Sequence, residues 1–175
     1  MLFRSAIAFT VGDVETAVAA LTVTASSSNT GLVAAGGIAL GGSGASRTIT
    51  LTPVANANGT TTITVTVNDG ASTATTTFVL TVTAVNDVPV ATAQSVTVTE
   101  DTAATITLAG TDVEGSTLTY TVVTQPSKGV LSGTAPNLTY TPNANATGSD
   151  SFTFKVNDGT VDSVAATVSI TISAV

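Results

Sequence analysis

Apolar and polar residues alternate with a period of two along short segments of this chain. Leu118, Tyr120 and Val122 would share one face of an extended strand, and the threonines between them would share the other. The segment 152–156 repeats this alternation with two phenylalanines and a valine. The pattern predicts half-buried strands, which in the second half of the chain we expect at Ser95–Thr99, Ala104–Ala109, Leu118–Val123, Gly129–Ser132, Leu138–Thr141, Ser151–Val156 and Ala165–Ser173.

Clusters of Gly, Pro, Asn and Asp separate these predicted strands. Examples are Glu114-Gly115, the stretch Asn143 to Gly148, and Asn157-Asp158-Gly159. Short strands of this kind, seven in about 90 residues and each with one apolar face, are typical of a β-sandwich. A closed barrel is the lesser alternative. We therefore predict an all-β chain built from Ig-like antiparallel β-sandwiches.

Four motifs occur twice, in the same order and at an offset of 89–99 residues. The pairs are Asp13-Val14-Glu15 with Asp112-Val113-Glu114, Thr52 to Gly59 with Thr141 to Gly148, Asn68-Asp69-Gly70 with Asn157-Asp158-Gly159, and Thr83-Ala84-Val85 with Ser173-Ala174-Val175. This ordered series predicts two tandem domains, residues 1–85 and 86–175. Residues 86–89 are expected to form a short, stiff linker, because Pro89 cannot donate to a strand ladder and biases Val88 towards an extended backbone.

The first copy begins later in the repeat than the second. When the two Asp-Val-Glu motifs are aligned, Ser5 falls on Ala104, so the first copy lacks a counterpart of the strand predicted at Ser95–Thr99. A sandwich short of one strand exposes core residues and an unpaired edge. We expect the missing strand to come from upstream sequence, or alternatively from a neighbouring chain. Met1–Ser5 resembles a translated sequencing adapter, and our hypothesis is that it is not native.

Composition narrows the possible functions. Val, Ile, Leu, Ala and Thr dominate, which favours strands. The chain has no cysteine and no histidine, which excludes a thiol nucleophile, a disulfide framework and the common zinc and copper ligands. The net charge of −7 makes nucleic acid a poor partner. No apolar run approaches the roughly 18 residues of a membrane helix, so we expect no membrane insertion of this segment.

The carboxylates are concentrated in predicted loops. Because loops gather at the two ends of a sandwich, the loops of Asp112, Glu114 and Asp158 should meet the linker residues Asn86 and Asp87 at the module junction. Converging carboxylates repel one another, and Ca²⁺, with about six to eight oxygen ligands, removes that repulsion. The alternative is ordinary, solvated turns without metal. Two further candidate groups are Glu100, Asp101 and Asp150 at the opposite pole, and Asp13, Glu15 and Asp69 at a pole of the first module.

The second copy carries a series of motifs along its full length. They are Asn86-Asp87-x-Pro89, Thr99-Glu100-Asp101, Asp112-x-Glu114-Gly115, Pro126-x-x-Gly129, Tyr140-x-Pro142, Gly148-x-Asp150-x-Phe152 and Asn157-Asp158-Gly159. This pattern resembles the cadherin-like and bacterial Ig-like tandem repeats of large, RTX-type surface adhesins. The resemblance implies an extracellular location, many repeats in series and calcium at the module junctions. From Ser5 onward the first copy resembles a divergent subtype of the same repeats.

We expect a stalk or spacer segment that projects a distal adhesive domain from a bacterial cell, with adjacent repeats or neighbouring copies as partners. The 4% of aromatic residues favours a spacer, since binding hot spots favour Trp, Tyr and Arg. The alternative is the subunit of an extracellular filament assembled by strand exchange. A weaker third hypothesis is a host or sugar ligand bound by the loops. Paired carboxylates could act as in glycosidases, but the chain has no Trp and only two Tyr to wall a cleft, so we expect no enzymatic activity.

Overall fold

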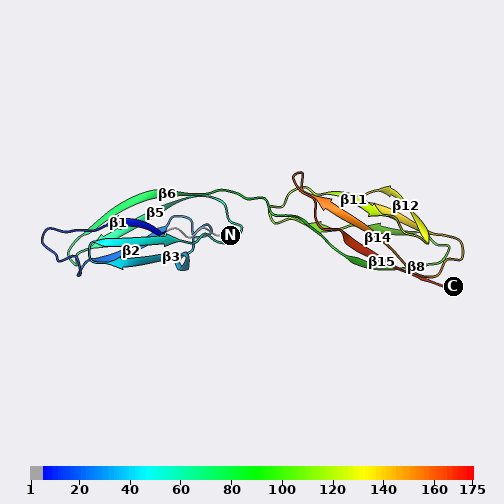
Figure 1. Cartoon of the computed structure of the whole chain (residues 1–175), viewed down its shortest axis with the longest axis horizontal. Helices are drawn as coiled ribbons and strands as arrows, with labels where there is room; N and C mark the ends of the chain where they lie inside the picture. The colour runs from blue at the N-terminus through cyan, green and yellow to red at the C-terminus, as the bar shows by residue number, and fades with distance from the viewer. Residues whose placement is uncertain (1–5) are drawn as a thin grey trace. The chain divides into compact units, whose positions relative to one another are not determined.

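The computed structural model describes residues 6–175 and divides the chain into two compact units, a first domain, Met1–Val85, and a second domain, Asn86–Val175 (Figure 1). Both are built from strands, and the helical structure of the described residues is one 3₁₀ turn at Ala35–Gly37. The predicted all-β class is confirmed. Across residues 6–175, no helix has the length and apolar character needed to cross a membrane. The hypothesis about Met1–Ser5 lies outside the described residues.

The first domain is formed by two three-stranded antiparallel sheets, β1-β4-β3 and β2-β5-β6. Its strands are β1 (Ala6–Thr10), β2 (Thr22–Ser27), β3 (Ile38–Ser43), β4 (Ser46–Leu51), β5 (Gly59–Asn68) and β6 (Thr73–Val82). The ten-residue strands β5 and β6 pair without a register shift along their whole length. Ile63 and Val65 of β5 are buried, with half-exposed threonines between and beside them, as the period of two requires.

The second domain contains a four-stranded sheet, β11-β14-β15-β8, a three-stranded sheet, β12-β13-β9, and the short pair β10-β7. Its strands are β7 (Val90–Ala91), β8 (Gln94–Thr99), β9 (Ala104–Thr107), β10 (Gly110–Thr111), β11 (Thr119–Thr124), β12 (Gly129–Thr134), β13 (Asn137–Pro142), β14 (Gly148–Asn157) and β15 (Ala166–Ser173). All seven predicted strands are present with boundaries shifted by a few residues. The pair β7 and β10 was not predicted. One pair also departs from the expected antiparallel pattern, because β8 runs parallel to β15.

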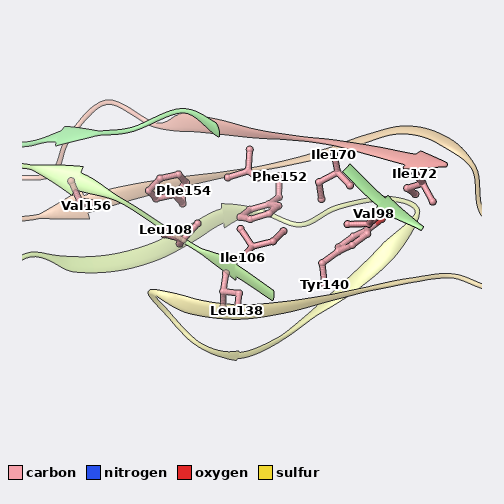
Figure 2. Packing of buried hydrophobic residues seen from close by; sticks show 11 residues of the cluster. Val98, Ile106, Leu108, Leu138, Tyr140, Phe152, Phe154, Val156, Ile170 and Ile172 are labelled. Carbon is pink, nitrogen blue, oxygen red and sulfur yellow. The ribbon is translucent and has the colours of Figure 1, made fainter. Parts of the chain in front are cut away.

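The core of the second domain lies between its two larger sheets (Figure 2). Phe152, Phe154 and Val156 of β14 are at most 1% exposed, which confirms the alternation seen in the sequence. They pack in one cluster with residues of the opposing sheet, including Ile106 and Tyr140. Burial of large side chains on both inner faces stabilises the sandwich by removing apolar area from water.

Sheet order makes β1 to β6 the respective counterparts of β9, β11, β12, β13, β14 and β15. The core of the first domain is smaller, with Leu32, Val33, Ile49, Leu51, Ile63 and Val65 as its buried cluster. Within residues 6–85, β6 pairs with β5 alone, whereas its counterpart β15 pairs with both β14 and β8. Among the described residues, the first domain therefore has one open strand edge where the second domain has a neighbour.

Candidate metal centre

The linker residues are tied to loops of the second domain. The Asn86 side-chain amide donates to Asp158 Oδ2 at 2.7 Å, and the Asp87 backbone N–H donates to Glu114 Oε2 at 3.1 Å. Pro89 follows and is fully buried. The structure therefore brings the linker together with the two loops that the sequence pattern assigned to this pole, the linker end of the second domain.

The loop between β14 and β15 is shaped by its own side chains. Asp158 Oδ1 accepts the backbone N–H groups of Thr160 at 2.6 Å and Val161 at 2.7 Å. Asn157 Oδ1 accepts the N–H of Gly159, whose φ of +97° favours glycine. The amide of Asn86 and these backbone donors lower the pKa of Asp158, because they stabilise its ionised form. At neutral pH this loop therefore presents a carboxylate to the linker.

Asp112 stands out among the acidic residues of the linker end. Its Oδ1 accepts the backbone N–H of Ser116 at 2.8 Å, but its Oδ2 is buried and receives no hydrogen bond. Buried carboxylate oxygens are normally paired, and one left without a donor destabilises the fold. A cation bound at this oxygen would remove that penalty.

The donor set at the linker end fits a calcium ion in its chemistry. Asp87, Asp112, Glu114 and Asp158 supply carboxylate oxygens and Asn86 supplies an amide oxygen, all of them hard ligands of the kind that Ca²⁺ prefers. Within residues 6–175, however, no three acidic side chains are grouped closely enough to hold a metal ion. One oxygen of Asp158 and one of Glu114 instead accept hydrogen bonds from the linker. Any ion would therefore use the other carboxylate oxygens or replace these hydrogen bonds.

The candidate residues at the opposite pole are not brought together. Glu100 Oε1 accepts the N–H of Val175 at 3.0 Å, and Asp101 Oδ1 accepts the N–H of Asn145 at 3.0 Å. Asp101 has a φ of +58°, as befits the turn that follows β8. Both carboxylates thus hold chain segments to each other.

Asp150 is a buried structural carboxylate. It accepts the backbone N–H groups of Ser127, Lys128 and Ser151 at 2.8 to 2.9 Å, and the Tyr140 hydroxyl at 2.8 Å. Burial alone would raise the pKa of Asp150, but these donors outweigh it and lower the pKa to about 2. Burial, together with the hydrogen bond to this anion, raises the pKa of Tyr140.

The grouping of Asp150 with Glu100 and Asp101 therefore needs correction, because its oxygens are already engaged inside the domain. The sequence analysis missed this network. A signal for it was present, since Pro126-x-x-Gly129 and Tyr140-x-Pro142 occur in the same motif series as Asp150. Gly129 admits the tyrosine ring, because a Cβ there would stand 2.5 Å from two of its carbon atoms.

The acidic residues of the first domain close turns. Asp13 Oδ1 accepts the N–H groups of Glu15 and Thr16, and Asp69 Oδ1 accepts those of Ala71 and Ser72. These backbone donors lower the pKa values of Asp13 and Asp69. Within residues 6–85 they form no metal cluster with Glu15.

Comparison with known proteins places these features in a family context. Residues 86–171 match the family model of the bacterial Ig domain. No curated protein matches the chain. Among solved structures, human protocadherin-24 EC1-2 is 13% identical, with 89% of this chain and 83% of that chain covered and a TM-score of 0.54. The extracellular cadherin domains 1-5 of protocadherin gamma B2 are 12% identical, with coverage of 98% and 40% and a TM-score of 0.52.

An endo-fucoidan hydrolase of glycoside hydrolase family 107 is 25% identical over 99% of this chain, with a TM-score of 0.41. This chain spans only 27% of the length of that enzyme. The likeness to the protocadherins shows a shared fold of tandem cadherin-like sandwiches, which confirms the predicted architecture.

Proposed function

Residues 86–171 belong to the bacterial Ig domain family, and on this premise we propose that the chain is a stalk segment of a long extracellular bacterial surface protein, stiffened by calcium at its domain junctions. Tandem Ig-like and cadherin-like domains are typical of extracellular multidomain proteins. The stalk role would place an adhesive domain at a distance from the cell. This segment would contribute part of the length of the stalk and would limit how far the stalk can bend.

The observation that carries this proposal is the linker end of the second domain. Asn86 and Asp87 are hydrogen-bonded to the loops of Asp158 and Glu114, and Asp112 Oδ2 in the second of these loops is buried without a donor. These five residues are the ones that would hold calcium. When bound, the ion would neutralise their mutual repulsion and pin the linker to its own domain.

The linker contacts support this proposal, because they attach part of the linker to the second domain. The Asn86 amide and the Asp87 N–H hold the linker backbone against the second domain. The buried Pro89 has a fixed φ and restricts the backbone of Val88 before it. A linker fixed at several points has fewer accessible angles than a free one. Calcium at Asp112 and Glu114 would strengthen this attachment.

We also propose that the segment is not catalytic. The second domain has an open hollow of about 620 Å³, lined largely by Ser and Thr side chains of β14 and β15. Asp150 is the one titratable residue among those that line it, and its oxygens accept hydrogen bonds from Ser127, Lys128, Tyr140 and Ser151. A carboxylate with a pKa of about 2 is a poor general base near neutral pH.

Calcium-dependent unfolding of the second domain tests the stalk proposal. Both tyrosines, Tyr120 and Tyr140, lie in this domain and the chain has no Trp, so tyrosine fluorescence reports its unfolding selectively. At a calcium concentration of 100 times Kd, we expect about 2.7 kcal/mol of added stability relative to the same chain in chelator. Asp112→Asn should remove most of this gain.

The matched control is Asp162→Asn. Asp162 is also acidic and lies in the loop between β14 and β15, but it pairs with Lys155 and with the Asn157 amide. This variant should keep the stabilisation by calcium. Magnesium at the same concentration should not stabilise the unmodified chain to the same extent. If the melting curves with calcium and with chelator coincide, the calcium part of the proposal fails. If in addition the radius of gyration of the chain does not change with calcium, the stiffening mechanism fails as well.

A further inference from the structure

Strand β6 has the composition of an interior strand although it lies at a sheet edge. Its ten residues, Thr73–Val82, include no charged residue and no proline. Its pairing with β5 shows no bulge. Charged residues, prolines and bulges usually protect the edge strands of natural proteins from pairing with other chains. For example, β11, an edge strand of the second domain, has a register shift between Val122 and Thr124.

The core-facing side of β6 is also incompletely covered. Phe78, Leu80 and Val82 are half-buried although they pack against the core of the first domain. Their counterparts on β15, identified by pairing with the equivalent long strand, are Val168, Ile170 and Ile172. Those three are at most 2% exposed.

The second domain shows what covers this position. There β8 pairs with the outer edge of β15 in parallel, from Gln94 opposite Val168 to Thr99 opposite Ser173. Val96 and Val98 of β8 pack against the core, and Val98 is 4% exposed. The intervening Ser and Thr residues face outward. A strand with this alternation supplies both the ladder hydrogen bonds and the missing apolar cover.

Residue pairing shows where the equivalent strand would lie in sequence. Ala6 is opposite Thr50 in the first domain, and Thr105 is opposite Thr139 in the second. The repeat motifs align Thr50 with Thr139, so Ala6 is the counterpart of Thr105. The counterpart of β8, which ends at Thr99, would therefore lie directly upstream of Met1.

We propose that the outer edge of β6 is a docking surface for a parallel β-strand of the β8 type, supplied by the polypeptide immediately upstream of the first domain. The occupant has alternating β-branched apolar and hydroxyl residues, with two apolar side chains directed at Phe78 and Leu80. A strand that directly precedes β1 can reach β6 through a short turn, as Glu100–Ala103 allows between β8 and β9. This proposal does not depend on calcium.

The test replaces Met1–Ala6 of the full chain with a copy of Asn86–Thr105. All measurements are made in chelator, so that failure of the calcium proposal cannot affect the result. We expect the unfolding midpoint of the first domain to rise by at least about 5 °C, the shift that a small stabilisation produces in a domain of this size. Hydrogen exchange of the β6 amides should slow by about tenfold or more.

The control is the same fusion with the copied positions of Val96 and Val98 changed to Ser. It has the same length and charge but cannot supply the apolar cover, and it should show little of either effect. Equal midpoints for the fusion, the control and the unmodified chain would overturn the proposal. So would concentration-dependent dimers of the unmodified chain with protected β6 amides, because the occupant would then be a second copy.

Discussion

The two domains place a polar side chain at the same point of their long central strands, but the second domain uses a carboxylate and the first a hydroxyl. Asp150 of β14 pairs with Ile170, and Thr61 of β5 pairs with Leu80 at the equivalent register. Both side chains are buried, with 9% and 3% of their surface exposed. The position therefore accepts either group, provided that the surrounding chain supplies suitable partners.

The partners differ as the chemistry requires. Thr61 Oγ1 contacts the hydroxyl groups of Ser27 and Ser28 and accepts the N–H of Asn29. Asp150, which is charged, is surrounded by donors from Ser127, Lys128, Tyr140 and Ser151. In both domains some of these partners lie just after the strand that precedes the long central strand in its sheet. They follow β2 in the first domain and β11 in the second. A buried anion needs more donors than a buried hydroxyl, and the second domain has a buried tyrosine for this purpose.

Removing the two side chains should have unequal effects. Asp150→Ala leaves the Tyr140 hydroxyl and the N–H groups of Ser127 and Lys128 without an acceptor, so we expect a loss of about 3 kcal/mol or more. Thr61→Ala leaves neutral hydroxyls that can reorient, and we expect about 1 kcal/mol from the first domain. Urea unfolding followed by tyrosine fluorescence and by far-UV circular dichroism separates the two domains. Equal losses would show that the charge of Asp150 is not what distinguishes the sites.

Glycine replacement near this network should be equally selective. Gly129→Ala places a methyl group 2.5 Å from the buried Tyr140 ring, and overpacking of this kind costs up to about 3 kcal/mol. Gly36, an exposed glycine in the 3₁₀ turn of the first domain, provides the comparison, because a Cβ there meets nothing within 4 Å. Gly36→Ala should therefore leave the first domain almost unchanged. The melting temperatures of the two variants give the comparison, and a stable Gly129→Ala chain would mean that Tyr140 can move.

Acid should weaken the second domain through Asp150. Its pKa of about 2 in the folded state lies below the ordinary value of 3.8, so its ionised form stabilises the fold above about pH 4. That contribution, about 2 kcal/mol, is lost as the pH falls from about 4 to about 2. Asp150→Asn should lose less stability over this interval. Urea midpoints of both chains at several pH values measure the difference, and parallel pH profiles would contradict the assignment.

The linker contact should have the smallest effect. Asn68-Asp69-Gly70 and Asn157-Asp158-Gly159 form turns with the same side-chain to backbone hydrogen bonds. They differ at the second carboxylate oxygen, which accepts the Ser72 hydroxyl in the first domain and the Asn86 amide in the second. These groups are exposed, so Asn86→Ala should lower the stability of the second domain by no more than about 1 kcal/mol.

Hydrogen exchange of the Asp87 amide sharpens this last comparison. Asn86→Ala should speed its exchange if the two linker contacts support each other, whereas Ser72→Ala should not affect it. Unchanged exchange in both variants would indicate that Asp87 is held by Glu114 alone.

Sequence patterns by themselves determined the longer strands of the second domain, the turns and the repeat. Alternation with a period of two is set by the backbone geometry of a strand, and it located all seven predicted strands of the second domain, including the phenylalanines of β14. The Asn-Asp-Gly turns are likewise local, because their side chains bond to backbone groups two or three residues away. The repeat alignment also predicts the position of the strand that we propose pairs with β6.

Only the tertiary structure decided the surroundings of each carboxylate. Alternation along β14 places Asp150 on the same inward face as Phe152, but no local pattern shows which groups surround Asp112, Asp150 and Asp158. Asp150 is buried because Tyr140 and the segment after β11 fold over it, whereas Asp158 meets a linker 72 residues away. The parallel pairing of β8 with β15 is equally non-local. Burial and hydrogen-bond partners depend on which distant segments pack together, and this information is carried by the whole fold rather than by any single motif.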